Sequence, residues 1–138
     1  MKIMNFALLA GVAGLLAAYS GCNVVEPADL NNQRVFFAFN SAEISEEAND
    51  NLLGQSLYMK NHEDTKIQIA GNCDERGSTE YNLALGARRA NAAKKVLVED
   101  GIDPRRISTI SYGKERPLVL GTGEEVWKFN RNATTTVK

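Results

Sequence analysis

The order of strand-like and helix-like stretches constrains the fold of this chain more than any other feature. Four stretches rich in β-branched, aromatic or alternating apolar residues are expected to be strands, namely 35–39, 66–70, 107–112 and 133–137. Apolar residues at helical spacing predict helices over about 45–61 and 79–100, and a short helix over 124–130. The order β-α-β-α-β-(α)-β predicts an α+β two-layer sandwich, in which a four-stranded sheet carries helices on one face.

Both long helices begin with residues that can cap them. Ser45 precedes Glu46 and Glu47, two acids that suit the positive end of a helix dipole. Ser78 or Thr79 can cap the second helix in the same way. These residues predict that the two helices start at about residues 45 and 79.

A hydrophobic segment near the start of the chain indicates export. Residues 6–18 are apolar or glycine and carry no charge, whereas a helix needs about 20 such residues to cross a bilayer. Lys2 before this segment and the small residues after it are typical of a secretory signal peptide. We therefore expect residues 1–21 to be a signal peptide.

Cys22 follows Ser20-Gly21, at the expected cleavage point. This arrangement resembles the lipobox of bacterial lipoproteins, although Tyr19 stands where that pattern prefers Leu. The resemblance implies that Cys22 carries a covalent lipid such as palmitate. Because Asn23 follows it instead of Asp, the resemblance also implies anchoring in the cell outer membrane, with the domain facing the periplasm. The alternative is an ordinary signal peptide that ends beside a cysteine by chance.

The segment after the lipidation site reads as a linker. Residues 23–33 are mostly polar and contain Pro27, so we expect residues 22–33 to form the lipidated cysteine and a flexible tether. The folded domain is then expected to cover residues 34–138.

Composition excludes several classes of protein. The chain has 16 Lys and Arg against 17 Asp and Glu, whereas a protein that binds nucleic acid through broad electrostatics is normally basic. One histidine and two cysteines do not suffice for a zinc finger or a disulfide scaffold. We therefore expect no nucleic-acid partner and no metal site.

Chemically informative residues gather in the loop 71–78, between a predicted strand and the long predicted helix. Asp74 in this loop offers an acceptor for an ammonium group, and Arg89 on the helix can point back towards the loop. A carboxylate beside a guanidinium suits a ligand that carries both an ammonium and a carboxylate. A purely structural ion pair between Asp74 and Arg89 is the alternative, and these two residues alone leave it open.

Spaced motifs around this loop occur in a fixed order. They are Gly71-x-x-Asp74-x-x-Gly77, Tyr81-Asn82, Leu85-Gly86-x-x-Arg89-Ala90, Ser111-Tyr112-Gly113, Trp127 and Asn130-Arg131. Over about residues 35–138 the pattern resembles the OmpA-like peptidoglycan-binding domain family. The run Asp74-Glu75-Arg76-Gly77 and the lipobox are more narrowly similar to the Pal-type lipoproteins of the Tol–Pal system within that family.

The resemblance implies binding of peptidoglycan. In the family, residues at the positions of Asp74 and Arg89 hold the diaminopimelate of the stem peptide. Six further residues are implied to line the same groove: Phe39, Asn40, Gly77, Asn82, Leu85 and Arg131. The implied function is to tether the outer membrane to the cell wall, with a role in envelope integrity and in constriction at division. An adaptor that mainly binds TolB and TolA, with weak or no wall binding, is the alternative.

Three residues depart from the family pattern. Asn40 stands where the family usually has Asp, which removes a charge that would attract an ammonium group. Asn72 stands where many members have His, and Asn132 replaces the second Arg of an Asn-Arg-Arg run. The last change removes a cation near the implied ligand.

An enzymatic function is not expected. His62 is the only histidine, so Cys73 has no adjacent base to activate it as a nucleophile. Asp74 and Glu75 are neighbours in one loop and are poorly placed to act as a glycosidase pair. We therefore expect a binding protein without a cofactor, in which the lipid on Cys22 is the only attached group.

Overall fold

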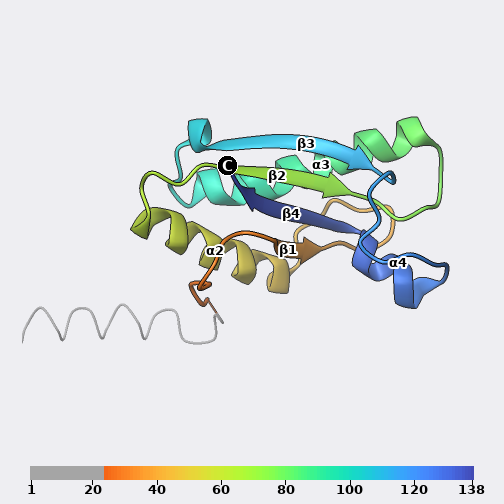
Figure 1. Cartoon of the computed structure of the whole chain (residues 1–138), viewed down its shortest axis with the longest axis horizontal. Helices are drawn as coiled ribbons and strands as arrows, with labels where there is room; N and C mark the ends of the chain where they lie inside the picture. The colour runs from red at the N-terminus through yellow and green to blue at the C-terminus, as the bar shows by residue number, and fades with distance from the viewer. Residues whose placement is uncertain (1–23) are drawn as a thin grey trace, which may run out of the picture.

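The computed structural model describes residues 24–138, so the predicted signal peptide 1–21 and the predicted lipidation site Cys22 lie outside the described residues. Four strands form one sheet, in the order β1-β4-β2-β3. They are β1 (Gln33–Phe36), β2 (Ile67–Asn72), β3 (Ile107–Gly113) and β4 (Asn132–Val137). Strand β4 runs antiparallel to β1 and β2, whereas β2 and β3 are parallel. The ends of β1, β2 and β3 therefore meet the start of β4 at one end of the sheet (Figure 1).

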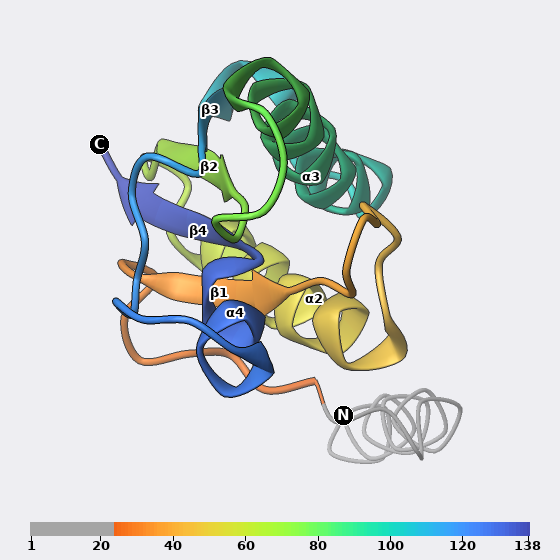
Figure 2. The same ribbon diagram turned by 90° about the vertical axis from the view of Figure 1, so that its right-hand side faces the viewer.

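Two long helices, α2 (Glu46–Asn61) and α3 (Thr79–Glu99), cover one face of this sheet (Figure 2). The short helix α4 (Glu124–Asn130) lies instead at the end of the sheet where β4 begins. A 3₁₀ turn, Pro104–Arg106, precedes β3. The predicted α+β two-layer architecture is confirmed. Among residues 24–138, no helix has the length and apolar content that a membrane span requires.

The predicted caps are present at both long helices. The Ser45 hydroxyl accepts a hydrogen bond from the Ala48 amide at 3.1 Å, and the Ser78 hydroxyl accepts one from the Tyr81 amide at 3.1 Å. Each bond satisfies an amide that the helix itself leaves free. The starts of α2 and α3 are thus fixed by local sequence.

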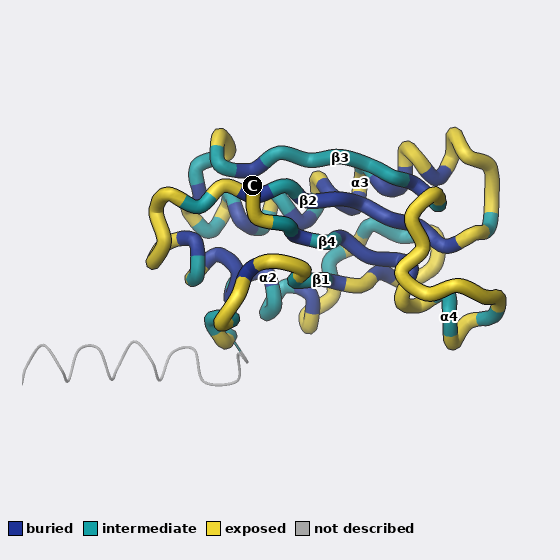
Figure 3. Tube along the Cα trace, in the orientation of Figure 1, coloured by how far each residue is buried: buried dark blue, intermediate teal, exposed yellow. Residues whose placement is uncertain are grey.

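The core is formed by residues of the sheet and of the two long helices, and Figure 3 shows the buried segments in both layers. Ile67 and Ile69 point inward from β2, as their alternation predicts, and Leu52 and Leu97 meet them from the helices. Burying a side chain of this size contributes about 1.5–3 kcal/mol.

Helix α3 approaches β2 closely because two glycines face each other. A Cβ added to Gly71 would lie 1.7 Å from the Gly86 carbonyl oxygen. Only residues without a side chain allow the helix to approach the strand this closely. The contact positions α3 just behind the loop that follows β2.

The first strand is shorter than the sequence predicts. Pairing with β4 ends at Phe36, and one further bond joins the Phe37 amide to the Arg131 carbonyl at 2.9 Å. Asn40 then adopts a left-handed conformation (φ +56°), which Asn tolerates better than most residues. The prediction of a strand as far as Phe39 was therefore wrong for its last residues: Phe37 is buried, whereas Phe39 is exposed.

The segment that we expected to be a tether packs against the domain at its C-terminal part. Leu30 is completely buried in the core. The Asn32 amide donates to the Thr135 carbonyl at 2.7 Å, and the Asn31 side chain accepts from the Val137 amide at 3.0 Å. The packed part of the chain thus begins before Arg34.

Candidate functional site

The candidate site lies at the end of the sheet where two loops and a short helix meet. The loop after β2 supplies Asp74 and Arg76, and the turn after β1 supplies Phe39. Helix α4 and the residue after it supply Trp127 and Arg131. Because β4 runs antiparallel to β1 and β2, the segments that follow β1 and β2 and the segment that precedes β4 lie at the same end of the sheet.

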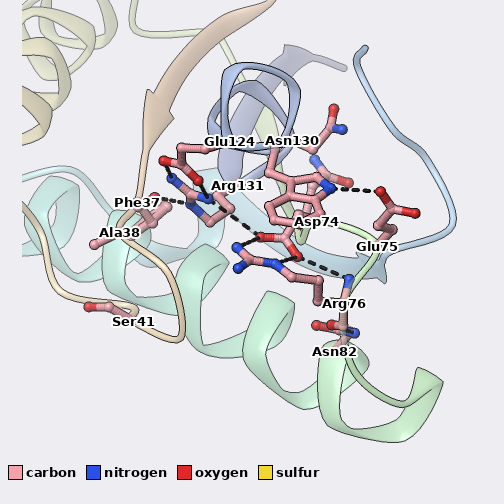
Figure 4. A network of polar contacts seen from close by, with 12 residues as sticks. Phe37, Ala38, Ser41, Asp74, Glu75, Arg76, Asn82, Glu124, Asn130 and Arg131 are labelled. Atoms are coloured by element: carbon pink, nitrogen blue, oxygen red, sulfur yellow. Dashed lines mark hydrogen bonds and ion pairs between the residues drawn. The ribbon is translucent and has the colours of Figure 1, made fainter. Parts of the chain in front are cut away.

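Asp74 is the centre of a charged network (Figure 4). Its Oδ1 accepts hydrogen bonds from the Arg76 amide at 3.0 Å and from Arg76 Nε at 3.1 Å, and its Oδ2 accepts one from Arg76 Nη2 at 2.8 Å. On the other side, Arg131 Nη1 lies 3.5 Å from Oδ2. The Asp74 side chain is only 5% exposed, so these two cations replace water around it.

Arg131 links this network to α4. Its Nη1 and Nη2 donate to the two carboxylate oxygens of Glu124 at 2.9 and 2.8 Å, and its Nε donates to the Phe37 carbonyl at 2.8 Å. Such a bidentate pair fixes the guanidinium plane as well as its position. Arg131 is therefore held by three segments of the chain at once.

Arg89 is only 1% exposed, and it contacts the backbone instead of a carboxylate. Its guanidinium donates to three backbone carbonyls, those of Ser41 at 2.8 Å, Asn72 at 2.9 Å and Ala38 at 3.1 Å. It thereby joins the turn after β1 to the end of β2. Within residues 24–138 the cationic partners of Asp74 are Arg76 and Arg131, so the expected alternative of an Asp74–Arg89 ion pair is wrong.

Two aromatic rings cover the Arg76 guanidinium. Its Cζ lies 3.9 Å from the ring centroid of Phe39 and 3.9 Å from that of Trp127. The Trp127 ring is fixed in turn, because Nε1 donates to Glu75 at 2.6 Å, and Glu75 also accepts from Thr122 at 2.8 Å. The loop that carries Asp74 is thus joined to α4 through both Glu75 and Arg76.

A small pocket lies beneath Arg76. Its lining comprises Phe39, Asn40, Cys73, Asp74, Arg76, Tyr81, Asn82, Leu85 and Arg89. The free volume among these side chains is about 10 Å³, which is room for one water molecule at most. The pocket is therefore filled by the protein's own side chains.

The charges around this pocket shift several pKa values. Burial raises the pKa of Asp74, but the hydrogen bonds and charge of Arg76 outweigh it and hold the pKa below its ordinary value. The bidentate contact with Arg131 lowers the pKa of Glu124. Burial raises the pKa of the Cys73 thiol, which is free and donates to the Asn82 carbonyl at 3.3 Å. Asp74 and Glu124 are therefore ionised at neutral pH, and Cys73 is a thiol.

The structure gathers all eight residues that the sequence indicated as a groove. Six of them line the pocket: Phe39, Asn40, Asp74, Asn82, Leu85 and Arg89. Arg131 contacts Asp74, and Gly77 adopts a positive φ of 96° beside the Asn82 side chain. Asn82 also donates to the Arg76 carbonyl at 2.8 Å and so fixes the loop.

Sequence reasoning missed Arg76, Trp127, Glu75 and Glu124 as parts of the site. The Asp74-Glu75-Arg76 spacing was a usable signal, because an Asp two residues before an Arg can accept both its amide and its guanidinium. The contacts of Trp127 and Glu124 had no local signal, since both residues lie on α4, far along the chain.

Two of the departures from the family pattern contact each other. The Asn72 side-chain amide donates to the Asn132 side-chain oxygen at 2.9 Å, across β2 and β4. Asn132 also donates to the Phe129 carbonyl at 2.8 Å. Both residues are buried, and Asn132 is held by β2 and by the end of α4, away from the pocket that Asp74 lines. In the described part of the chain, no cluster of three or more His, Cys, Asp or Glu side chains is arranged to hold a metal ion.

Comparison with known proteins gives consistent matches. The OmpA family profile matches residues 36–131. The peptidoglycan-associated lipoprotein of Mesorhizobium japonicum is 44% identical over 75% of this chain, which spans only 62% of that relative's length. The peptidoglycan-associated lipoprotein of Haemophilus influenzae is 36% identical over 96% of both chains. The crystal structure of the peptidoglycan-associated lipoprotein from Burkholderia pseudomallei has a TM-score of 0.75 and 38% identity, covering 77% of this chain and 90% of the other. None of these relatives is named as an enzyme, in agreement with the predicted binding role.

Proposed function

Because this chain belongs to the OmpA family, and within it to the peptidoglycan-associated lipoproteins, we propose that it binds peptidoglycan without covalent attachment. The recognised group is the diaminopimelate of the stem peptide, which carries an ammonium and a carboxylate on one carbon. One observation supports this most directly: Asp74 and Arg89 line the same pocket. An ionised carboxylate and a guanidinium in one pocket match the two charges of that ligand.

The two charged residues offer different contacts. Asp74 accepts hydrogen bonds only, so it suits an ammonium group. Arg89 has five N–H groups, and its bonds to Ser41, Asn72 and Ala38 leave one N–H on each terminal nitrogen. Those two groups suit a carboxylate. The same three bonds hold the guanidinium in place before the ligand arrives, which reduces the entropy cost of binding.

Anchoring at both ends makes such a protein a tether. We propose that Cys22 carries the lipid, that the lipid sits in the outer membrane, and that the domain faces the periplasm. Linking two attachments in one chain raises the effective concentration of each. In this proposal the protein keeps the outer membrane close to the wall, within the Tol–Pal system and during constriction at division.

A second candidate is an adaptor whose main partners are TolB and TolA. Phe39 and Tyr81 line the pocket and are 58% and 42% exposed. Exposed aromatic side chains around a polar site favour contact with another protein. The same surface would then serve the wall and the partner in turn.

Sedimentation with purified peptidoglycan sacculi tests the proposal. The full-length protein, purified in detergent, should sediment with walls that contain diaminopimelate. Asp74→Ala should abolish this binding, because the ammonium then lacks its partner. Asp103→Ala is the matched control, since Asp103 also pairs with an arginine two residues later but lies away from the pocket. Absence of wild-type binding, with retained binding to purified TolB, would favour the adaptor.

A further inference from the structure

We propose that Arg76 occupies the place of the ligand's ammonium group and so restricts the site to ligands that also carry a carboxylate. This inference rests on the proposed function. A carboxylate offers about four acceptor positions. Arg76 fills three of those on Asp74, and Arg131 lies 3.5 Å from the remaining side. An incoming ammonium can therefore reach Asp74 only when the Arg76 guanidinium moves away.

The Arg76 guanidinium fits its position as a bound ligand would. Phe39 and Trp127 each lie 3.9 Å from its Cζ, a distance at which a cation is attracted to an aromatic ring. Only about 10 Å³ remains free in the pocket beneath it. The Arg76 side chain, which is partly exposed, is thus one wall of this small pocket.

The surrounding contacts allow the side chain of Arg76 to move without its backbone. Its carbonyl accepts from Asn82 at 2.8 Å, and the next carbonyl, that of Gly77, accepts from Lys114 at 2.6 Å. Its amide donates to Asp74. By contrast, the Arg76 side chain is about one third exposed. Displacement is therefore a change of side-chain rotamer, and Asp74 keeps its orientation through the amide bond.

The balance of charges then discriminates between ligands. When a ligand ammonium displaces Arg76, the Arg76–Asp74 pair is lost and an ammonium–Asp74 pair is gained. Diaminopimelate brings a carboxylate beside its ammonium, so the displaced Arg76 can pair with it. The lysine of other walls has an ammonium at the same distance along its side chain but no carboxylate there. Arg76 is then left without a partner, and binding is weaker.

Two variants test this inference. Arg76→Gln removes the internal cation, and Arg76→Lys keeps the charge but loses the two-pronged contact. The matched control is Arg105→Gln, because Arg105 pairs with Asp103 in the same way at an exposed position. Thermal unfolding by circular dichroism verifies that each variant is folded. Binding is measured with full-length protein in detergent, against sacculi of the diaminopimelate type and of the lysine type.

We expect Arg76→Gln to reduce the preference for diaminopimelate walls about three- to tenfold, mainly by strengthening binding to lysine walls. The preference of Arg76→Lys should lie between those of wild type and Arg76→Gln, and the preference of Arg105→Gln should equal that of wild type. Trp127 is the only tryptophan in the chain, so its fluorescence reports the displacement. Soluble muropeptides containing diaminopimelate should change its emission in the wild type, and much less in Arg76→Gln.

The outcomes separate this inference from the proposed function. If the wild type binds diaminopimelate walls and Arg76→Gln keeps the same preference, Arg76 is not the discriminating group and the inference is wrong. Equal weakening for both walls would mean that Arg76 supports binding without discriminating between the two ligands, which also contradicts the inference. If the wild type binds neither wall, the proposed function fails and the inference fails with it.

Discussion

Two Asp-x-Arg pairs with the same local geometry lie in very different surroundings. In one, the Arg76 amide and Nη2 donate to Asp74 at 3.0 and 2.8 Å. In the other, the Arg105 amide and Nη2 donate to Asp103 at 2.9 and 2.7 Å. The first pair lines the pocket at the end of the sheet, and the second caps the 3₁₀ turn before β3.

Their exposure differs sharply. The side chains of Asp74 and Arg76 are 5% and 32% exposed, whereas those of Asp103 and Arg105 are 40% and 89% exposed. Aromatic rings cover Arg76, and a second arginine approaches Asp74. The same local motif can therefore serve as a simple turn or as part of a binding site, and the surrounding segments decide which.

The largest difference in stability between the two regions should appear when Arg89 in one and Arg105 in the other are replaced by alanine. Arg89→Ala removes a buried side chain and its hydrogen bonds to one buried and two partly buried backbone carbonyls, so we expect a loss of about 3–5 kcal/mol in the free energy of unfolding. Arg105→Ala should change the free energy of unfolding very little, because exposed ion pairs contribute little. Urea unfolding of the full-length protein in detergent measures both. Similar small losses for the two variants would show that the Arg89 contacts do not support the site.

Replacing each aspartate should give a smaller difference in the same direction. Asp74→Asn weakens the hydrogen bonds to Arg76 and Arg131, and we expect a loss of about 1–3 kcal/mol at pH 7. The loss for Asp103→Asn should be smaller, since water replaces its contacts. The pKa of Asp74 lies below its ordinary value in the folded protein. Its contribution is therefore complete above the unfolded pKa of about 4 and is lost as the pH falls through the folded pKa.

The pH dependence can be measured in the same experiment. The difference in unfolding free energy between wild type and Asp74→Asn should be full at pH 7 and should shrink as the pH falls below about 4. A difference that grows on acidification would mean that the folded protein raises this pKa instead of lowering it.

Salt should reveal the smallest difference between the two pairs. The Arg105 contact lowers the pKa of the exposed Asp103 to about 2. Salt screens exposed charges more than buried ones, so adding about 1 M salt should move the pKa of Asp103 towards its ordinary value more than that of Asp74. Carboxyl titration by NMR follows both groups in one sample. A larger shift at Asp74 would contradict its burial.

The sequence predicted the elements well because their signals are local. Ser45 and Ser78 cap the helices as expected, and the alternation in β2 points Ile67 and Ile69 into the core. The end of the first strand was not predictable, because it depends on where β4 begins to pair. The burial of Leu30 was missed for a similar reason, since a single apolar residue in a polar segment carries no periodicity.

The sequence indicated that Asp74 and Arg89 lie close together, but not which groups each of them contacts. Asp74 and Arg89 line one pocket, yet the donors of Arg89 go to backbone carbonyls. Every residue has a carbonyl, so no side-chain pattern can indicate which ones an arginine will meet. The pairing of Asp74 with Arg131 likewise joins two distant parts of the chain.

The sequence by itself determined the order of the elements and the two Asp-x-Arg pairs, because turns and caps form between residues that are neighbours in the chain. Only the tertiary structure decided that one pair lines a pocket. Phe39 reaches this pair from the turn after β1, Trp127 from α4, and Arg131 from the position between α4 and β4. These segments meet because β1 and β2 end where β4 begins, at one end of the sheet. Burial and electrostatics depend on such distant neighbours, which a local motif does not specify.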